Sequence, residues 1–332
     1  MAAGLLHTSA DAGTRRPFIV ESDLPDDVGA MFEVTDEGRC VFFDRSDHLC
    51  IVHRDLGEAA LPATCRHFPR LAVVDRRGTF ITLSHFCPTA ASMLFRDVPV
   101  HVVEHPPAFP PNDYEGLIVE DDAFPPLLTP TMLMDLDGYS AWERHMVAAF
   151  ADMDRGPDAS LATLMRDARR LGGWRPGASS LVEAVAALPP GVVAAETPPT
   201  LERSLRLHAE VVTAMPEDLR PDSDEADLEL AYQRLVAPVH RQFGAPINRY
   251  LAGKAFASWS AYQGRGVATI VRGLEAALAV VRVEAARECR NAGHALDAAL
   301  LLQAFRSADF ALNHLAVGED LCAAWGAVEG QP

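Results

Sequence analysis

The chain has 332 residues, and its 46 acidic against 29 basic side chains give a formal net charge of −17. This charge repels nucleic acid and anionic lipid, so we expect neither a nucleic acid nor a membrane as a partner. A lysine-bearing protein surface suits the charge better. With 49% hydrophobic and 23% charged residues, the composition is that of a globular protein whose core needs no metal or disulfide for bulk stability. Two modules are expected for this length.

Residues 1–12 lack the basic region and apolar core of a signal peptide, and no run of about 18 apolar residues occurs. These features favour a cytoplasmic protein. In a reducing cytosol, cysteines that lie together usually bind metal or carry out redox chemistry instead of forming disulfides.

Residues 1–37 form a polar N-terminal segment that Gly and Pro interrupt and that contains no cysteine. Over residues 38–97, short β-type runs alternate with turns, which predicts a cysteine-bearing module. Two hairpins are expected there, one from Cys40–Phe43 and Leu49–Val52, the other from Leu71–Val74 and Thr79–Leu83. Short helices are expected at His53–Ala60 and from Pro88 to Phe95.

Residues 98–130 are rich in proline and are predicted to be a surface connector, because proline suits neither a continuous helix nor a central strand. Periodic apolar positions then predict a helical domain over residues 131–325. Its expected helices cover residues 137–153, 161–171, 179–187, 200–215, 226–236, 247–262, 266–292 and 295–315. The predicted fold class is α+β, a small cysteine-rich module with two β-hairpins followed by a mainly helical domain.

Four of the six cysteines fall within 48 residues, in the spacing Cys-x9-Cys-x14-Cys-x21-Cys: Cys40, Cys50, Cys65 and Cys87. Each lies at the edge of a predicted element, so one small module can bring all four thiolates to one point. Thiolates suit a soft cation, which predicts a metal centre, either tetrahedral zinc or an iron–sulfur cluster. The alternative is four buried structural cysteines, since free cysteine is among the most buried residue types.

Four histidines lie within three residues of one of these cysteines: His48, His53, His67 and His85. Imidazole binds zinc and iron well, but histidines near a metal often only support its ligands. We expect His67 and His85 to be the better ligand candidates.

Arg66 and Arg70 flank Cys65 within what the sequence predicts to be one turn-like segment. Their guanidinium groups suit two tasks, offsetting the charge of a thiolate cluster or binding the carboxylate of a cosubstrate. The other interpretation is a pair of surface salt bridges to Asp55 or Glu58.

Residues 244–266 contain several aromatic and basic side chains, and such side chains can line a ligand pocket. Tyr250, Ala255, Trp259 and Tyr262 follow helical spacing, so amphipathic packing is the favoured interpretation.

Five segments, four of which carry the cysteines, resemble a known family: Cys40–Phe43, Leu49–His53, Leu56–Pro62, Thr64–Arg70 and Leu83–Ala91. Over about residues 38–95 the chain is similar to the cysteine-cluster family of zinc- or iron-chelating proteins, and within it to the flagellin lysine-N-methylase branch. That branch also joins a cysteine module to a long helical part, a likeness that is only general here. Its members usually begin with a further cysteine cluster, whereas residues 1–39 of this chain contain no cysteine.

The resemblance implies a metal centre on Cys40, Cys50, Cys65 and Cys87, foremost a 4Fe-4S iron–sulfur cluster, with zinc as the other candidate. It also implies methyl transfer from S-adenosylmethionine to a lysine of a protein partner. The competing expectations are a non-catalytic metal-binding or metal-handling module and a structural cysteine core without metal. The sequence identifies no catalytic residue.

Overall fold

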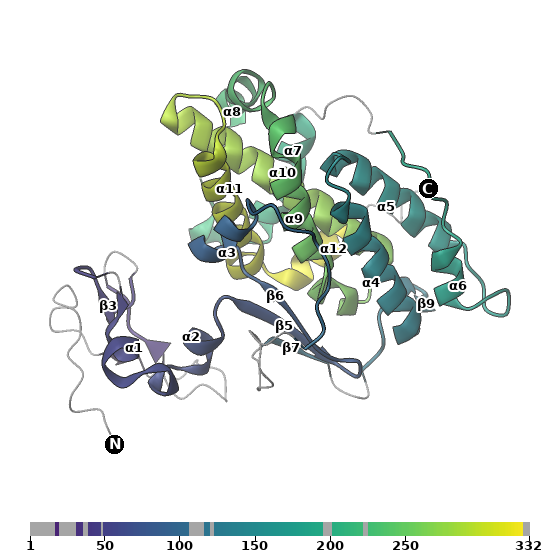
Figure 1. Ribbon diagram of the computed structural model, residues 1–332, viewed down its shortest axis with the longest axis horizontal. Helices are drawn as coiled ribbons and strands as arrows, with labels where there is room; N and C mark the ends of the chain where they lie inside the picture. Colours follow the sequence, from purple (N-terminus) through teal and green to yellow (C-terminus); the bar gives the residue numbers. More distant parts are fainter. Residues whose placement is uncertain are drawn as a thin grey trace. The chain divides into compact units, whose positions relative to one another are not determined.

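The computed structural model describes residues 17–19, 31–35, 39–47, 49–105, 116–119, 123–194, 201–221 and 225–327. The chain divides into two compact units, Met1–Phe68 and Pro69–Pro332 (Figure 1). This boundary falls inside residues 38–97, which were predicted to form one cysteine-bearing module. The second predicted hairpin and Cys87 therefore belong to the second unit. Most of the predicted polar segment 1–37 lies outside the described residues.

The first unit contains two short antiparallel pairs and three helical segments. Strand β1 (Phe18–Ile19) pairs with β2 (Met31–Phe32), and β3 (Phe43–Asp44) pairs with β4 (Leu49–Cys50). Helix α1 (Ile51–Leu56), a 3-10 turn (Glu58–Ala60) and helix α2 (Ala63–His67) follow. The first predicted hairpin is thus confirmed in a shorter form, with Cys50 opposite Phe43. The expectation that Cys40 lies on its first arm is wrong, because Cys40 forms an isolated bridge with Val34.

The predicted second arm of that hairpin is shorter because Ile51 and Val52 belong to α1. Both side chains are buried, and Val52 packs with Val41 and Phe42 in a small core of its own. The ring of Phe32 adds to this core, with its centroid 4.8 Å from that of Phe42. In α1 the consecutive side chains of Ile51 and Val52 are both buried, whereas consecutive side chains of a strand point to opposite faces.

The second unit contains a three-stranded sheet in the order β6-β5-β7. Strands β5 (Arg70–Asp75) and β6 (Gly78–Leu83) form the second predicted hairpin, which is confirmed, with Asp75 opposite Gly78. Strand β7 (Gly116–Ile118) runs parallel to β5. A Cβ at Gly116 would lie 2.1 Å from the carbonyl oxygen of Ala72, so this close approach requires glycine.

The expectation that residues 98–130 form only a surface connector is wrong, because they include β7 and also β8 (Leu127–Thr129). Strand β8 pairs with β9 (Met132–Leu133), and Leu128 is almost fully buried. The prolines of this segment lie outside these strands, which is why the strands can form.

Helices make up most of the second unit: α3 (Pro88–Met93), α4 (Leu136–Ala151), α5 (Pro157–Gly172), α6 (Leu181–Ala186), α7 (Leu201–Thr213), α8 (Glu225–Ala231), α9 (Gly244–Ala255), α10 (Val267–Ala292), α11 (Ala298–Phe310) and α12 (Gly318–Ala327). Most of the expected helices are present with shifted ends, while α12 was not expected. Helices α8 and α11 continue as π-helical turns at Tyr232–Val236 and Ala311–Leu315. The mixed α/β class with small sheets and a helical C-terminal region is confirmed.

Helix α10 is the centre of the helical region and packs against α5, α7, α9 and α11 (Figure 1). It is buried on nearly all sides, which its many alanines and valines permit. Its buried charges are paired, since Arg282 contacts Asp158 at 2.6 Å. Within the described part of the chain, no helix has both the length and the apolar composition that crossing a bilayer requires.

Candidate functional site

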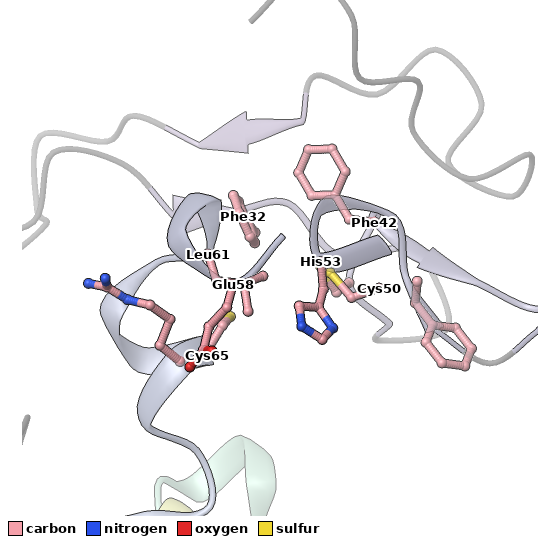
Figure 2. A pocket seen from close by; sticks show the side chains of 10 residues that line it. Phe32, Phe42, Cys50, His53, Glu58, Leu61 and Cys65 are labelled. Carbon is pink, nitrogen blue, oxygen red and sulfur yellow. The ribbon is translucent and has the colours of Figure 1, made fainter. Parts of the chain in front are cut away.

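Three of the predicted metal ligands line one pocket of the first unit. Cys40, Cys50 and Cys65 lie on the wall of a cavity of about 540 Å³, together with His53 and Glu58 (Figure 2). The rest of the wall is mainly aromatic and aliphatic. Three cysteines that lie between positions 40 and 65 of the chain therefore line one pocket.

Each cysteine is positioned by a different local element. Cys40 forms an isolated antiparallel bridge with Val34, and its carbonyl accepts the amide of Phe43 at 3.0 Å. Cys50 ends β4 and is the residue from which α1 starts. Cys65 lies in α2, which begins directly after Pro62, and is exposed to solvent.

Cys40 and Cys50 are close enough to affect each other electrostatically. Burial raises the pKa of the Cys40 thiol, and the negative charge of a Cys50 thiolate raises it further, against an opposing hydrogen bond from the backbone of Phe42. Without a metal, Cys40 is therefore a protonated thiol at neutral pH. Metal binding here would release a proton, as it does at thiolate sites generally.

The cysteines surround the pocket without converging on one point. Among the described residues, no group of three or more His, Cys, Asp or Glu side chains is already arranged to hold a metal ion. The donor set itself, three thiols and an imidazole, fits a soft transition metal. Coordination would require the side chains to turn inward, which the exposed position of Cys65 permits.

The fourth predicted ligand, Cys87, belongs to the second unit. It precedes α3, and Pro88 occupies the first turn of that helix, as predicted. Cys289 and Cys322 are buried among the helices, and none of the six cysteines forms a disulfide. The structure therefore brings three of the four predicted ligands together within one unit.

The two arginines predicted to bind a cosubstrate belong to different units. Arg66 lies on the wall of the cysteine pocket, whereas Arg70 is the first residue of β5 in the second unit. The predicted single turn containing both is wrong, because α2 ends at His67 and a strand begins at Arg70. Asp55, proposed above as a salt-bridge partner for these arginines, pairs with Arg54 at 2.9 Å.

The favoured histidine candidates do not lie on the pocket wall. His67 is buried in α2, and His85 lies in the second unit, while His48 is outside the described residues. His53 is the histidine that lines the pocket. The sequence signal that identifies it is the close pair Cys50-x-x-His53, which a search for Cys-x-x-Cys pairs overlooks.

A second group of polar residues is buried in the second unit around the carboxylate of Asp309. It accepts hydrogen bonds from the backbone amide of His85 at 2.5 Å, from Ser84 Oγ at 3.2 Å and from Tyr250 Oη at 3.3 Å, and it forms an ion pair with Lys254. Burial alone would raise the pKa of Asp309, but the Lys254 ammonium and the other donors lower it. Burial lowers the pKa of His85 to about 4, so this imidazole is neutral.

Lys254 is the only lysine in the sequence, against 28 arginines. That imbalance is a signal that could have identified the position, because lysine and arginine are exchangeable where only a surface charge is needed. Tyr250 and Ala255 are fully buried in α9 as expected. The continuous helical spacing through Trp259 and Tyr262 is wrong, because α9 ends at Ala255 and these two residues belong to a separate 3-10 turn.

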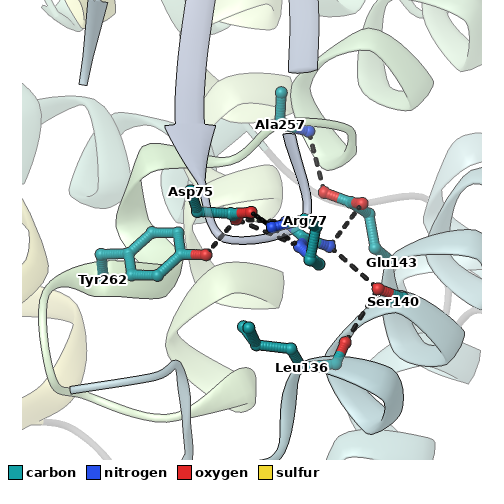
Figure 3. Close-up of polar contacts among 7 residues, drawn as sticks. All are labelled: Asp75, Arg77, Leu136, Ser140, Glu143, Ala257 and Tyr262. Carbon is teal, nitrogen blue, oxygen red and sulfur yellow. Dashed lines mark hydrogen bonds and ion pairs between the residues drawn. The ribbon is translucent and has the colours of Figure 1, made fainter. Parts of the chain in front are cut away.

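A third polar group joins the β5–β6 hairpin to α4 (Figure 3). Arg77 contacts Asp75 at 2.8 Å and Glu143 at 3.3 Å, and its guanidinium carbon lies 4.7 Å from the ring centroid of Tyr139. Tyr262 donates a hydrogen bond to Asp75, and the amide of Ala257 donates one to Glu143 at 3.0 Å. These residues are closely packed and support the fold of the second unit.

Comparison with known proteins adds no assignment: no family model, no curated protein and no solved structure matches this chain. The functional proposal below therefore starts from the residues that line the cysteine pocket.

Proposed function

We propose that the first unit binds a metal centre, zinc or an iron–sulfur cluster, through the thiolates of Cys40, Cys50 and Cys65. The observation that carries the proposal is that these three cysteines line one pocket. Thiolates are the preferred ligands of both kinds of centre. Arg66 on the same wall supports it further, because a guanidinium beside thiolates offsets their negative charge.

Anaerobic purification of the full chain, with elemental analysis and an absorption spectrum, tests this proposal. A brown protein with a broad visible band is the expected result for an iron–sulfur cluster, and a colourless protein with stoichiometric zinc is the expected result for a zinc site. Cys50→Ser and Cys65→Ser should each lower the metal content. Cys289→Ala, in the buried face of α10, is the matched control and should leave the metal content unchanged. A chain that contains no metal and takes up none after reconstitution would leave the structural cysteine core as the explanation.

Methyl transfer from S-adenosylmethionine to a protein lysine is the activity that the resemblance adds to this proposal. Its support is the likeness over residues 38–95 and the position of Arg66, whose guanidinium suits the carboxylate of the cosubstrate. The net charge of −17 suits a lysine-bearing protein substrate. Calorimetry of the metal-loaded chain should give saturable binding of S-adenosylmethionine that Arg66→Ala weakens. Absence of binding would favour a non-catalytic metal-binding or metal-handling module.

A further inference from the structure

We infer that His53 is the fourth ligand of the pocket, so that the first unit alone holds a single zinc-type ion through three sulfurs and one nitrogen. The inference rests on the proposed function and makes it more specific. It assigns a ligand outside the predicted cysteine quartet and makes Cys87 unnecessary for metal binding.

The first argument is the local geometry of Cys50 and His53. Cys50 immediately precedes α1, and His53 is the third residue of that helix. Residues three apart at a helix start lie on the same side of the helix, so both side chains can reach one ion. Zinc sites use the same short separation when two ligands are presented by one tight turn. Figure 2 shows Cys50 and His53 together with Cys65 around the pocket.

The second argument is the number of available ligands. Residues 1–68 contain three cysteines, whereas a 4Fe-4S cluster is ordinarily held by four thiolates. Three cysteines and one histidine are an established ligand set for tetrahedral zinc. The first unit therefore has the number and types of ligands that one zinc ion needs.

The third argument is charge. Three thiolates and one divalent cation leave a net charge of −1, and a neutral imidazole does not change it. Glu58, the other candidate ligand on the wall, would increase the negative charge to −2. The smaller net charge costs less in a pocket whose wall is mainly aromatic and aliphatic, which favours the imidazole over the carboxylate.

The ligand assignment is tested on the full chain, reduced and stripped of metal. It is titrated with zinc against a chromophoric chelator and, separately, with cobalt(II). The wild-type chain should bind one ion and give the strong visible bands of tetrahedral cobalt together with sulfur-to-cobalt charge transfer. His53→Ala should weaken zinc binding by more than about 100-fold, since loss of a residue that only supports a ligand already costs 10–100-fold. The variant should keep the charge-transfer band while its visible cobalt bands shift. His53 is exposed on α1, so alanine should not disturb the fold.

Three matched variants complete the test. Cys87→Ser and His101→Ala, both in the second unit, should keep wild-type zinc affinity and cobalt spectrum, and so should Glu58→Gln. Unchanged affinity and spectrum in His53→Ala would overturn the inference, as would loss of binding in Cys87→Ser or in Glu58→Gln. A wild-type chain that holds a stable iron–sulfur cluster would also overturn it but would support the proposed function. A wild-type chain that binds no metal at all would overturn both.

Discussion

Replacement of Arg77 by alanine should be among the most destabilising single changes in the second unit. The guanidinium is only 11% exposed, and its partners Asp75 and Glu143 are 2% and 4% exposed. Alanine leaves both carboxylates buried without their cation. Removing one partner from a buried ion pair typically costs about 3–5 kcal/mol. We expect a loss within this range and not above it, because Tyr262 and the Ala257 amide still donate hydrogen bonds to the two carboxylates.

The size of this loss should depend on pH. Burial raises the pKa of Glu143, and Arg77 opposes that rise. Burial also acts to raise the pKa of Asp75, but hydrogen bonds from Arg77 and Tyr262 hold it below its usual value of 3.8. In the wild type, the contribution of Asp75 is therefore present above pH 3.8 and is lost as the pH falls through the lower folded value.

Without Arg77, the pKa values of both carboxylates rise, so the folded variant takes up protons in mildly acidic solution. Proton uptake relieves the buried charge. The destabilisation caused by Arg77→Ala should accordingly be greatest at pH 7.5 and smaller near pH 5.

Urea unfolding followed by tryptophan fluorescence at both pH values measures the effect. Arg76→Ala is the control, since Arg76 occupies the same turn but is exposed, and exposed positions usually change stability by less than about 0.5 kcal/mol. A loss below about 1 kcal/mol at pH 7.5 would refute the reasoning that the ion pair is buried and uncompensated. Equal losses at the two pH values would refute the assignment of the cost to the carboxylates.

The remaining predictions concern three other sites. Gly266→Ala should destabilise the second unit by about 1–3 kcal/mol in thermal unfolding, because Gly266 has φ +92° and a Cβ there would lie 2.9 Å from Thr129 Cα. Gly244→Ala, with open space at the start of α9, should leave the melting temperature unchanged or slightly raised. Lys254→Met should cost about 3–5 kcal/mol by urea unfolding, because Asp309 is fully buried; a loss no larger than that of exposed Arg241→Met would contradict this. Zinc at 100 times its dissociation constant should stabilise the first unit by about 2.7 kcal/mol, seen as slower amide exchange in residues 49–68 of the wild type and absent in Cys65→Ser.

The parts of the fold that the sequence predicts are those determined by local pattern. The β5–β6 hairpin has alternating side chains and a two-residue turn between Asp75 and Gly78, so both strands and their pairing follow from neighbouring residues. Helix α3 follows from Pro88 in the same way. Strand β7 could not be predicted, because its pairing with β5 is parallel and joins residues about 44 positions apart in the chain.

The candidate site was also predicted only as far as local sequence allows. Cys40, Cys50 and Cys65 line one pocket of one compact unit, as their closeness in the sequence indicated, but the described side chains do not converge on one point. Cys87 was grouped with them because only 21 residues separate it from Cys65. The unit boundary between Phe68 and Pro69 intervenes, and no change in composition marks it.

The polar residues around Asp309 could not be grouped from the sequence. Its members come from the loop before Cys87, from α9 and from α11, so no spacing in the sequence relates them. The amino-acid composition gives one sign of this group, which is that Lys254 is the single lysine. An ammonium is compact and can approach a buried carboxylate that is already bonded to Ser84 and Tyr250, whereas a planar guanidinium needs more room. The ion pair with the buried Asp309 carboxylate is thus made by the compact ammonium of Lys254, whereas the other 28 Lys/Arg positions of the chain are arginine.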